Sequence, residues 1–116
     1  MEMENSSKMT SFLLEFSMFP TSDECREGSS VSKQVAKVID AIDKSGVPYQ
    51  LTPMGTVIEA SSMQEALDVV ALAYKQLEGC ERVYSSLKFD IRKNTTNRLK
   101  TKIASVEKVL QREVNH

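Results

Sequence analysis

The stretch VPYQLTPMGTVIEA, residues 47–60, decides the fold. Residues 47–52 have the composition of a short strand, residues 53–55 (Pro-Met-Gly) form a turn, and residues 56–60 continue as a second strand. Two short strands joined by a glycine-containing turn predict an antiparallel hairpin. The hairpin is informative because a helical pattern lies on either side of it.

Both flanking segments have apolar residues at the spacing of an amphipathic helix. The first helix can be capped by Ser29 or Ser30 and ends at Gly46, and the second can be capped by Ser61 or Ser62 and ends near Gly79. The predicted buried stripes are Val31, Val35, Val38, Ile39 and Ile42 in the first helix, and Met63, Leu67, Val70, Tyr74 and Leu77 in the second.

Two further strands lie outside these helices. Residues 10–19 and residues 82–92 alternate between two faces with the two-residue period of a strand. In the first strand one face carries Phe12, Leu14, Phe16 and Met18. A third helix follows the last strand, with its apolar positions at Leu99, Ile103, Val106 and Leu110. The basic residues of this helix are interpreted as a solvated face.

The element order is therefore β-α-β-β-α-β followed by a helix. This order predicts an α+β protein of the ferredoxin-like class, βαββαβ with an additional C-terminal helix and a four-stranded antiparallel sheet. Residues 10–116 form a single domain, and residues 1–9 are expected to be a disordered leader. The first two helices share one sheet face. The other face would expose Leu13, Phe19, Val57 and Tyr84, so we expect at least a dimer.

Composition excludes several classes of protein. The chain has 116 residues, 15 Lys plus Arg and 16 Asp plus Glu, with no apolar stretch long enough for a membrane helix. Residues 1–81 hold 6 basic and 13 acidic residues, and residues 82–116 hold 9 and 3. This asymmetry could steer an acidic partner or help subunits fit together, and we favour the second. We expect no nucleic acid or membrane partner, although a weak RNA-binding role of the basic segment is testable.

The residues needed for common catalytic and metal sites are missing. The only histidine is the last residue, His116, so a Ser-His or Cys-His pair is not expected. Cys25 and Cys80 form neither a CxxC motif nor a disulfide framework, which favours the reducing cytoplasm and a Cys25 thiol exposed in its loop. No nucleotide-binding glycine loop is present. We predict a protein that is not an enzyme and holds no metal or cofactor.

Several segments together resemble a known family. They are a first strand ending at Pro20, the Ser-Ser-Val start at residues 29–31, the YQLTPMGTVIE segment at 49–59 and the RVYSSLKFDIR segment at 82–92. The chain is similar to the small thiamine-binding proteins, the YkoF-like group. The resemblance covers nearly all of the chain from Met9 onward. It implies a ferredoxin-like fold, assembly into dimers and tetramers, and binding of thiamine or its hydroxymethylpyrimidine part without catalysis.

Glu59 is the first candidate binding residue, because a carboxylate in a short apolar strand needs a partner. It could accept a hydrogen bond from the pyrimidine amine, or form an ion pair with Lys88 or Arg82, and the ion pair is slightly favoured. Glu15 poses the same question, and an ion pair with Lys88 is favoured there too.

The other candidates are Ser30, Thr56, Tyr84 and Lys88. Thr56 beside Gly55 could let a ligand approach the backbone, or Gly55 could serve turn geometry alone. Ser30 could donate to a ligand or cap its helix. Tyr84 could stack on a ring or lie in an interface, and Lys88 could belong to a solvated or intersubunit charge ladder with Asp90 and Arg92.

The sequence thus predicts a cytoplasmic binding protein for thiamine or a related pyrimidine that forms homodimers or homotetramers. The alternative is a structural or regulatory homo-oligomer with no small-molecule ligand.

Overall fold

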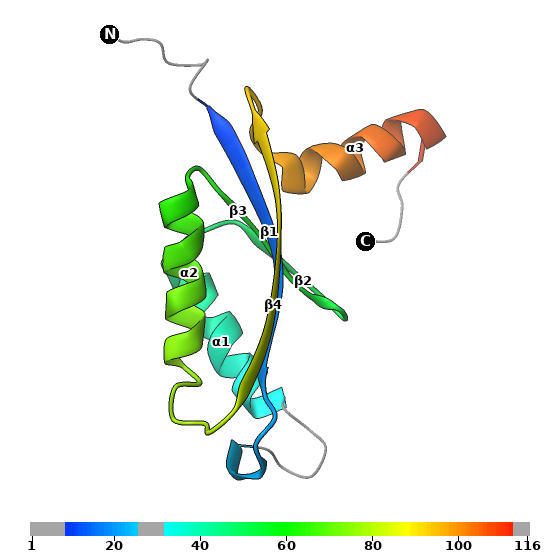
Figure 1. Ribbon diagram of the computed structural model, residues 1–116. Coiled ribbons are helices and arrows are strands. Elements are labelled where there is room, and N and C mark those ends of the chain that lie inside the picture. The colour runs from blue at the N-terminus through cyan, green and yellow to red at the C-terminus, as the bar shows by residue number, and fades with distance from the viewer. Residues whose placement is uncertain (1–8, 26–31, 113–116) are drawn as a thin grey trace, which may run out of the picture.

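The computed structural model describes residues 9–25 and 32–112. Its strands are β1 (Thr10–Pro20), β2 (Tyr49–Thr52), β3 (Gly55–Ala60) and β4 (Val83–Lys93). Its helices are α1 (Ser32–Ser45), α2 (Met63–Lys75) and α3 (Arg98–Leu110), with a short 3-10 helix, η2 (Asp23–Cys25), after β1. The predicted element order is confirmed (Figure 1). Eight of the nine residues of the predicted leader lie outside the described residues.

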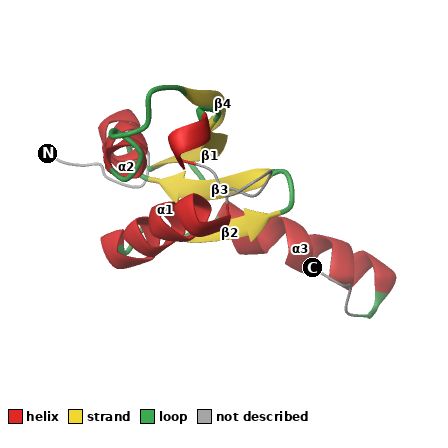
Figure 2. Cartoon of the chain, turned by 90° about the horizontal axis from the view of Figure 1, so that it is seen from below, coloured by secondary structure: helices red, strands yellow, loops and turns green. Residues whose placement is uncertain are grey.

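The four strands form one sheet in the order β2-β3-β1-β4, and all neighbours are antiparallel. Helices α1 and α2 cover one face of the sheet, with α2 toward β4 and α1 toward β2 (Figures 1 and 2). Helix α3 lies on the opposite side and points away from the sheet (Figure 1). This arrangement confirms the predicted α+β fold of the ferredoxin-like class.

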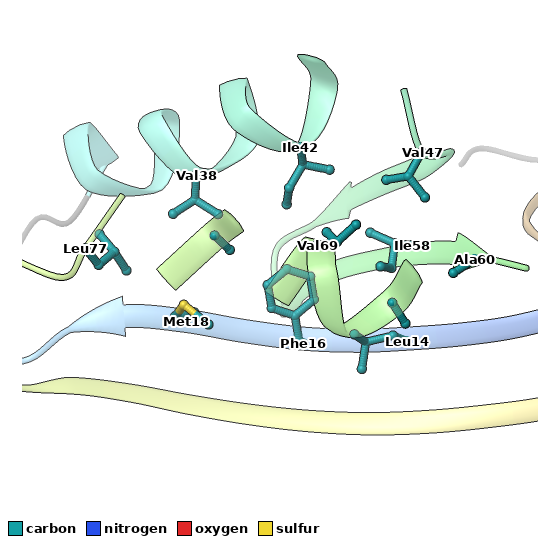
Figure 3. Close-up of a cluster of buried hydrophobic side chains, with 12 residues drawn as sticks. Leu14, Phe16, Met18, Val38, Ile42, Val47, Ile58, Ala60, Val69 and Leu77 are labelled. Atoms are coloured by element: carbon teal, nitrogen blue, oxygen red, sulfur yellow. The ribbon is translucent and has the colours of Figure 1, made fainter. Parts of the chain in front are cut away.

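The core lies between the sheet and the first two helices (Figure 3). The predicted alternation of β1 is confirmed, since its even-numbered apolar side chains face the helices. Leu14 and Ile58 of the central strands are fully buried, and Ile42 of α1 packs on them. The buried faces of β1 and α1 are thus predicted by the spacing of their apolar residues, which is two residues in the strand and about 3.6 in the helix.

The predicted buried stripe of α2 is largely wrong. The helix buries Ala66, Val69 and Ala73, and Leu77 is buried just beyond its end. The larger predicted residues Met63, Leu67 and Tyr74 are exposed instead. Small alanines let α2 lie close to the sheet and to α1, which favours the alanine stripe over the bulky one. The exposed side chains lie along one flank of α2.

The turn glycine of the hairpin serves the packing of the sheet. A Cβ on Gly55 would lie 2.9 Å from the Phe16 carbonyl oxygen of β1, and the φ of Gly55 is +156°. The side of Gly55 on which a Cβ would lie is therefore filled by the β1 backbone, so this position needs glycine for packing. The predicted approach of a ligand beside Gly55 stays a prediction.

The two cysteines form a disulfide, which corrects the prediction of unpaired thiols. The Cα atoms of Cys25 and Cys80 are 5.8 Å apart and their sulfurs are bonded. They lie far apart in sequence, and the spacing gave no motif for pairing. The fold brings them together because β1 and β4 are neighbours, so the loops at their adjoining ends meet. The expectation of a reducing compartment rested on unpaired cysteines and loses that support.

Hydrogen bonds between the two segments continue past the ends of β1 and β4, beside the disulfide. Thr21 N–H donates to the Arg82 carbonyl at 2.9 Å, and Glu81 N–H donates to the Glu24 carboxylate at 2.7 Å. The bond from Glu81 holds the pKa of Glu24 below its usual value. We call this junction of residues 21–25 with residues 80–82 the β1–β4 clasp.

Among the described residues, no helix is long and apolar enough to cross a membrane.

Candidate functional site

A hollow region lies between α1 and the β2–β3 hairpin. Two clefts of about 680 and 360 Å³ adjoin there, because both are lined by Val35, Ile39 and Leu51. We call their union the hairpin groove. Volumes of this size are typical of sites for small organic molecules.

The inner part of the groove is mainly apolar. It is lined by Phe16 and Met18 of β1, Val38 of α1 and the hairpin residues 51–56. Thr56, which is buried, is on the sheet face that looks toward the helices. The predicted site residue Thr56 therefore lines a cleft, with a hydroxyl as its polar group. A flat ring with one or two polar edges fits such a surface.

The outer part of the groove is acidic. Asp40 and Asp43 line it from α1, and Tyr49 lines it from β2. The Tyr49 hydroxyl donates to Asp43 at 2.9 Å, and this hydrogen bond raises the pKa of Tyr49. Asp40 pairs with Lys44 at 2.9 Å, and both side chains are exposed. Two carboxylates and an aromatic face favour a cationic group.

Glu59 takes part in a different cluster, on the sheet face away from the groove. Its carboxylate accepts hydrogen bonds from the Ser11 hydroxyl at 2.6 Å, from Arg98 N–H at 3.0 Å and from Leu99 N–H at 3.2 Å. The last two donors belong to the first turn of α3, whose cap residue Asn97 makes no side-chain capping bond. We call this cluster the α3 anchor. The predicted partners Lys88 and Arg82 are thus replaced by Ser11 and α3.

The Arg98 side chain completes the α3 anchor. It donates to the Ser11 hydroxyl and to the Ser11 carbonyl, both at 2.9 Å, and to the Asp90 carbonyl. It also pairs with the Asp90 carboxylate at 3.0 Å, and the Arg98 side chain is only 11% exposed. Ser11 is buried under this contact although it is polar. The anchor therefore ties α3 to both β1 and β4.

The α3 anchor predicts a pH dependence of stability. Partial burial raises the pKa of Glu59, but the bonds from Arg98 N–H, Ser11 and Leu99 N–H together outweigh it, so the pKa lies below its usual value. The pKa of a Glu side chain in the unfolded chain is about 4.3. Because the pKa of Glu59 is lower than this in the folded protein, the ionised carboxylate adds to the free energy of unfolding above about pH 4.3. This contribution is lost as the pH falls through the folded-state pKa. We expect the advantage of wild type over Glu59→Gln in unfolding free energy to shrink between pH 6 and pH 3. Urea unfolding at each pH measures it, and a constant difference would contradict the anchor.

The other predicted residues lie elsewhere. Tyr84 and Lys88 are exposed on the sheet face opposite the groove, where the Arg82 guanidinium lies 5.0 Å from the centre of the Tyr84 ring. Lys88 lies directly opposite Glu15 in the β1–β4 pairing. Ser30, with Ser29 and Val31, lies outside the described residues. Of the predicted site residues that the structure describes, Thr56 lies in the hairpin groove. The other three, which are Glu59, Tyr84 and Lys88, lie on the opposite face of the sheet.

Sequence reasoning missed the acidic part of the groove. Asp40 and Asp43 are three residues apart on α1, so they share a helix face, and Tyr49 begins the next strand. This spacing could have suggested an acidic edge. The binding roles predicted for Glu59, Tyr84 and Lys88 stay predictions.

Comparison with known proteins gives one consistent result. The model of a family described as thiamine-binding protein matches residues 14–107. A UPF0045 protein of Methanothermobacter thermautotrophicus is 35% identical over 81 residues, which are 68% of this chain and 82% of that protein.

Solved structures agree. A structure from Methanocaldococcus jannaschii has a TM-score of 0.68 and 32% identity, covering 83% of this chain and 95% of that one. A Thermotoga maritima protein, whose name assigns it to thiamine biosynthesis or salvage, has a TM-score of 0.61 over 83% and 98% of the two chains. Its identity of 20% supports likeness of fold.

Proposed function

Because the chain belongs to the thiamine-binding protein family, we propose that it binds free thiamine or its hydroxymethylpyrimidine part and does not change it chemically. The family match over residues 14–107 is the observation that carries the proposal. A role in holding or delivering the ligand needs no acid–base pair, in keeping with a chain whose one histidine is its last residue.

The hairpin groove is the site that we propose. Its apolar inner part suits the pyrimidine ring, and the Thr56 hydroxyl offers a hydrogen bond to a ring nitrogen or the exocyclic amine. Its outer part, with Asp40, Asp43 and Tyr49, suits the cationic thiazolium. The same two carboxylates disfavour a diphosphate, since like charges in one site repel.

Thermal unfolding with thiamine, hydroxymethylpyrimidine and thiamine diphosphate tests the proposal. Ligand at 100 times its Kd adds about 2.7 kcal/mol to the free energy of unfolding, which raises the Tm by several degrees in a domain of this size. We expect a dose-dependent rise with thiamine that is larger than the rise with its diphosphate. No rise with any of the three would favour the alternative, a homo-oligomer without a ligand.

A conservative substitution locates the site. Thr56→Val keeps the shape of the side chain and removes its hydroxyl, so we expect thiamine affinity to fall roughly 5–10-fold, the value of one hydrogen bond of about 1–1.5 kcal/mol. Thr10→Val is the matched control, because Thr10 lies at the end of β1 away from the groove-lining residues 16–19, where it pairs with Lys93 of β4. Calorimetric titration of both variants measures the change. Equal affinities for the two variants would remove Thr56 from the site.

We also propose self-association as part of the function. The chain forms homodimers or homotetramers, and the polarity between its acidic first 81 residues and basic remainder supports contacts between copies.

A further inference from the structure

The disulfide between Cys25 and Cys80 lies on the stretch of chain that links β1 to α1, two of the elements that line the hairpin groove. Residues 16–19 of β1 line the inner groove, and the β1–β4 clasp begins two positions beyond them, at Thr21. Cys25 stands seven positions before Ser32, the first residue of α1. The disulfide therefore constrains a short connection that has a wall of the groove at each end.

The two cysteines differ in how the rest of the fold holds them. Cys80 N–H donates to the Leu77 carbonyl at 2.9 Å, and the Leu77 side chain is buried in the core. Cys25 ends the short helix η2, which contains no buried residue. The disulfide thus ties a stretch with little packing of its own to a point that the core fixes.

Without the disulfide, the clasp depends on hydrogen bonds at the protein surface. Glu81 N–H donates to the Glu24 carboxylate, Arg82 N–H donates to the Ser22 hydroxyl at 3.2 Å, and both bonds are exposed. Exposed hydrogen bonds compete with water and open at low free energy. Neither cysteine belongs to the hydrophobic core. Breaking the disulfide therefore loosens the connection between β1 and α1 more than it loosens the core.

We propose that the Cys25–Cys80 disulfide is a reversible redox site that sets the affinity of the hairpin groove for its ligand. The oxidised clasp holds β1 and α1 in the positions that form the groove, and the reduced clasp lets these positions vary. Ordering the two walls at the moment of binding then costs free energy, so the reduced protein binds more weakly. This inference rests on the proposed function and names a regulation of its site.

The reductant is a dithiol, and the exchange takes place in two steps. A thiolate of the dithiol attacks one sulfur of the disulfide, a mixed disulfide forms, and the other cysteine leaves as a thiolate that takes up a proton. The second thiol of the dithiol loses its proton and displaces the first cysteine, which is protonated in turn. The net products are two protein thiols and the oxidised dithiol, with two electrons transferred. Neither cysteine is fully buried, so the exchange does not require the core to unfold.

Thiamine affinity in the two redox states tests the proposal. Calorimetric titration compares wild type in dithiothreitol with wild type in oxidised dithiothreitol, at a temperature where circular dichroism shows both to be folded. We expect reduction to weaken binding by roughly 10-fold, a size typical of coupling between two sites. The double variant Cys25→Ser/Cys80→Ser should bind as weakly as reduced wild type in both buffers. Equal affinities of oxidised and reduced wild type would overturn the proposal.

A core variant separates this effect from a general loss of stability. Val69→Ala leaves a cavity under α2 and lowers the free energy of unfolding, and Val69 does not line the groove. With its disulfide intact, Val69→Ala should bind thiamine as wild type does. If it binds as weakly as reduced wild type, the redox effect is a consequence of lower stability and the proposal fails.

Linkage supplies a second measurement with a different readout. If oxidation raises thiamine affinity 10-fold, thiamine must favour the disulfide over the two thiols by the same factor. In dithiothreitol redox buffers, saturating thiamine should therefore lower the midpoint reduction potential of the clasp by about 30 mV, the value of a 10-fold change for two electrons. A midpoint that bound thiamine does not move overturns this inference alone. Absence of thiamine binding in both redox states overturns the proposed function as well, so the two failures are distinguishable.

Discussion

Replacing Cys25 and Cys80 by serine is expected to lower the free energy of unfolding by about 4 kcal/mol. The disulfide joins residues 55 apart, and closing a loop of that length removes about this much chain entropy from the unfolded state. The loss is large beside a total stability of roughly 5–15 kcal/mol. We expect the Tm to fall by about 10–20 °C, which thermal unfolding by circular dichroism measures.

Reduction supplies the control for this prediction. Dithiothreitol should bring wild type down to the Tm of the double serine variant and leave that variant unchanged. The backbone hydrogen bond from Thr21 N–H to the Arg82 carbonyl in the β1–β4 clasp remains available in both proteins. If complete reduction lowers the free energy of unfolding of wild type by less than about 1 kcal/mol, the disulfide does not restrict the unfolded chain as expected.

Glu59→Ala is expected to cost about 2–3 kcal/mol and to loosen the start of α3. The carboxylate accepts three hydrogen bonds, and its removal leaves the amides of Arg98 and Leu99 and the hydroxyl of Ser11 without this acceptor. A part-buried donor left unsatisfied costs about 1–3 kcal/mol, and water reaches some of the three. Amide hydrogen exchange should accelerate at Arg98 and Leu99 while the core of α2 keeps its protection.

The same variant separates the two roles considered for Glu59. A side chain that only anchors α3 leaves the thermal shift with thiamine close to that of wild type, although the starting Tm is lower. Loss of the shift in Glu59→Ala, with retention in Thr56→Val, would move the binding site from the hairpin groove to the other sheet face. Protection of Arg98 equal to wild type would contradict the anchor itself.

Periodicity predicted the strands, the helices and their order, but it could not choose the buried face of α2. The helix has two stripes with the same spacing, one through Met63 and Leu67, and one through Ala66 and Ala73. Residue size favoured the first stripe at the sequence level. Close packing on the sheet favours the second, and this packing depends on the neighbouring helix, which a single segment does not encode.

The surroundings of Glu59 show a different limit. The sequence indicated that this carboxylate needs a partner, and charged side chains on neighbouring strands were the natural candidates. The donors are instead backbone amides of α3, 39 and 40 residues further along the chain. Nearly every residue type supplies a backbone N–H, so the sequence does not mark which amides at the start of a helix will donate to a distant carboxylate. The pairing of Cys25 with Cys80 was hidden in a similar way, since only the neighbouring positions of β1 and β4 bring the thiols together.

The pairing of the first strand with the last has a consequence during synthesis. β1 leaves the ribosome early, but its 11-residue partner β4 begins 63 residues after Pro20, at Val83. At about 5–20 residues per second, that interval lasts roughly 3–13 s. Throughout it, the strand carrying Leu14 and Phe16 has one edge without its native neighbour. A nascent chain stalled before Val83 should therefore be a strong chaperone client, and one extended past Lys93 should not.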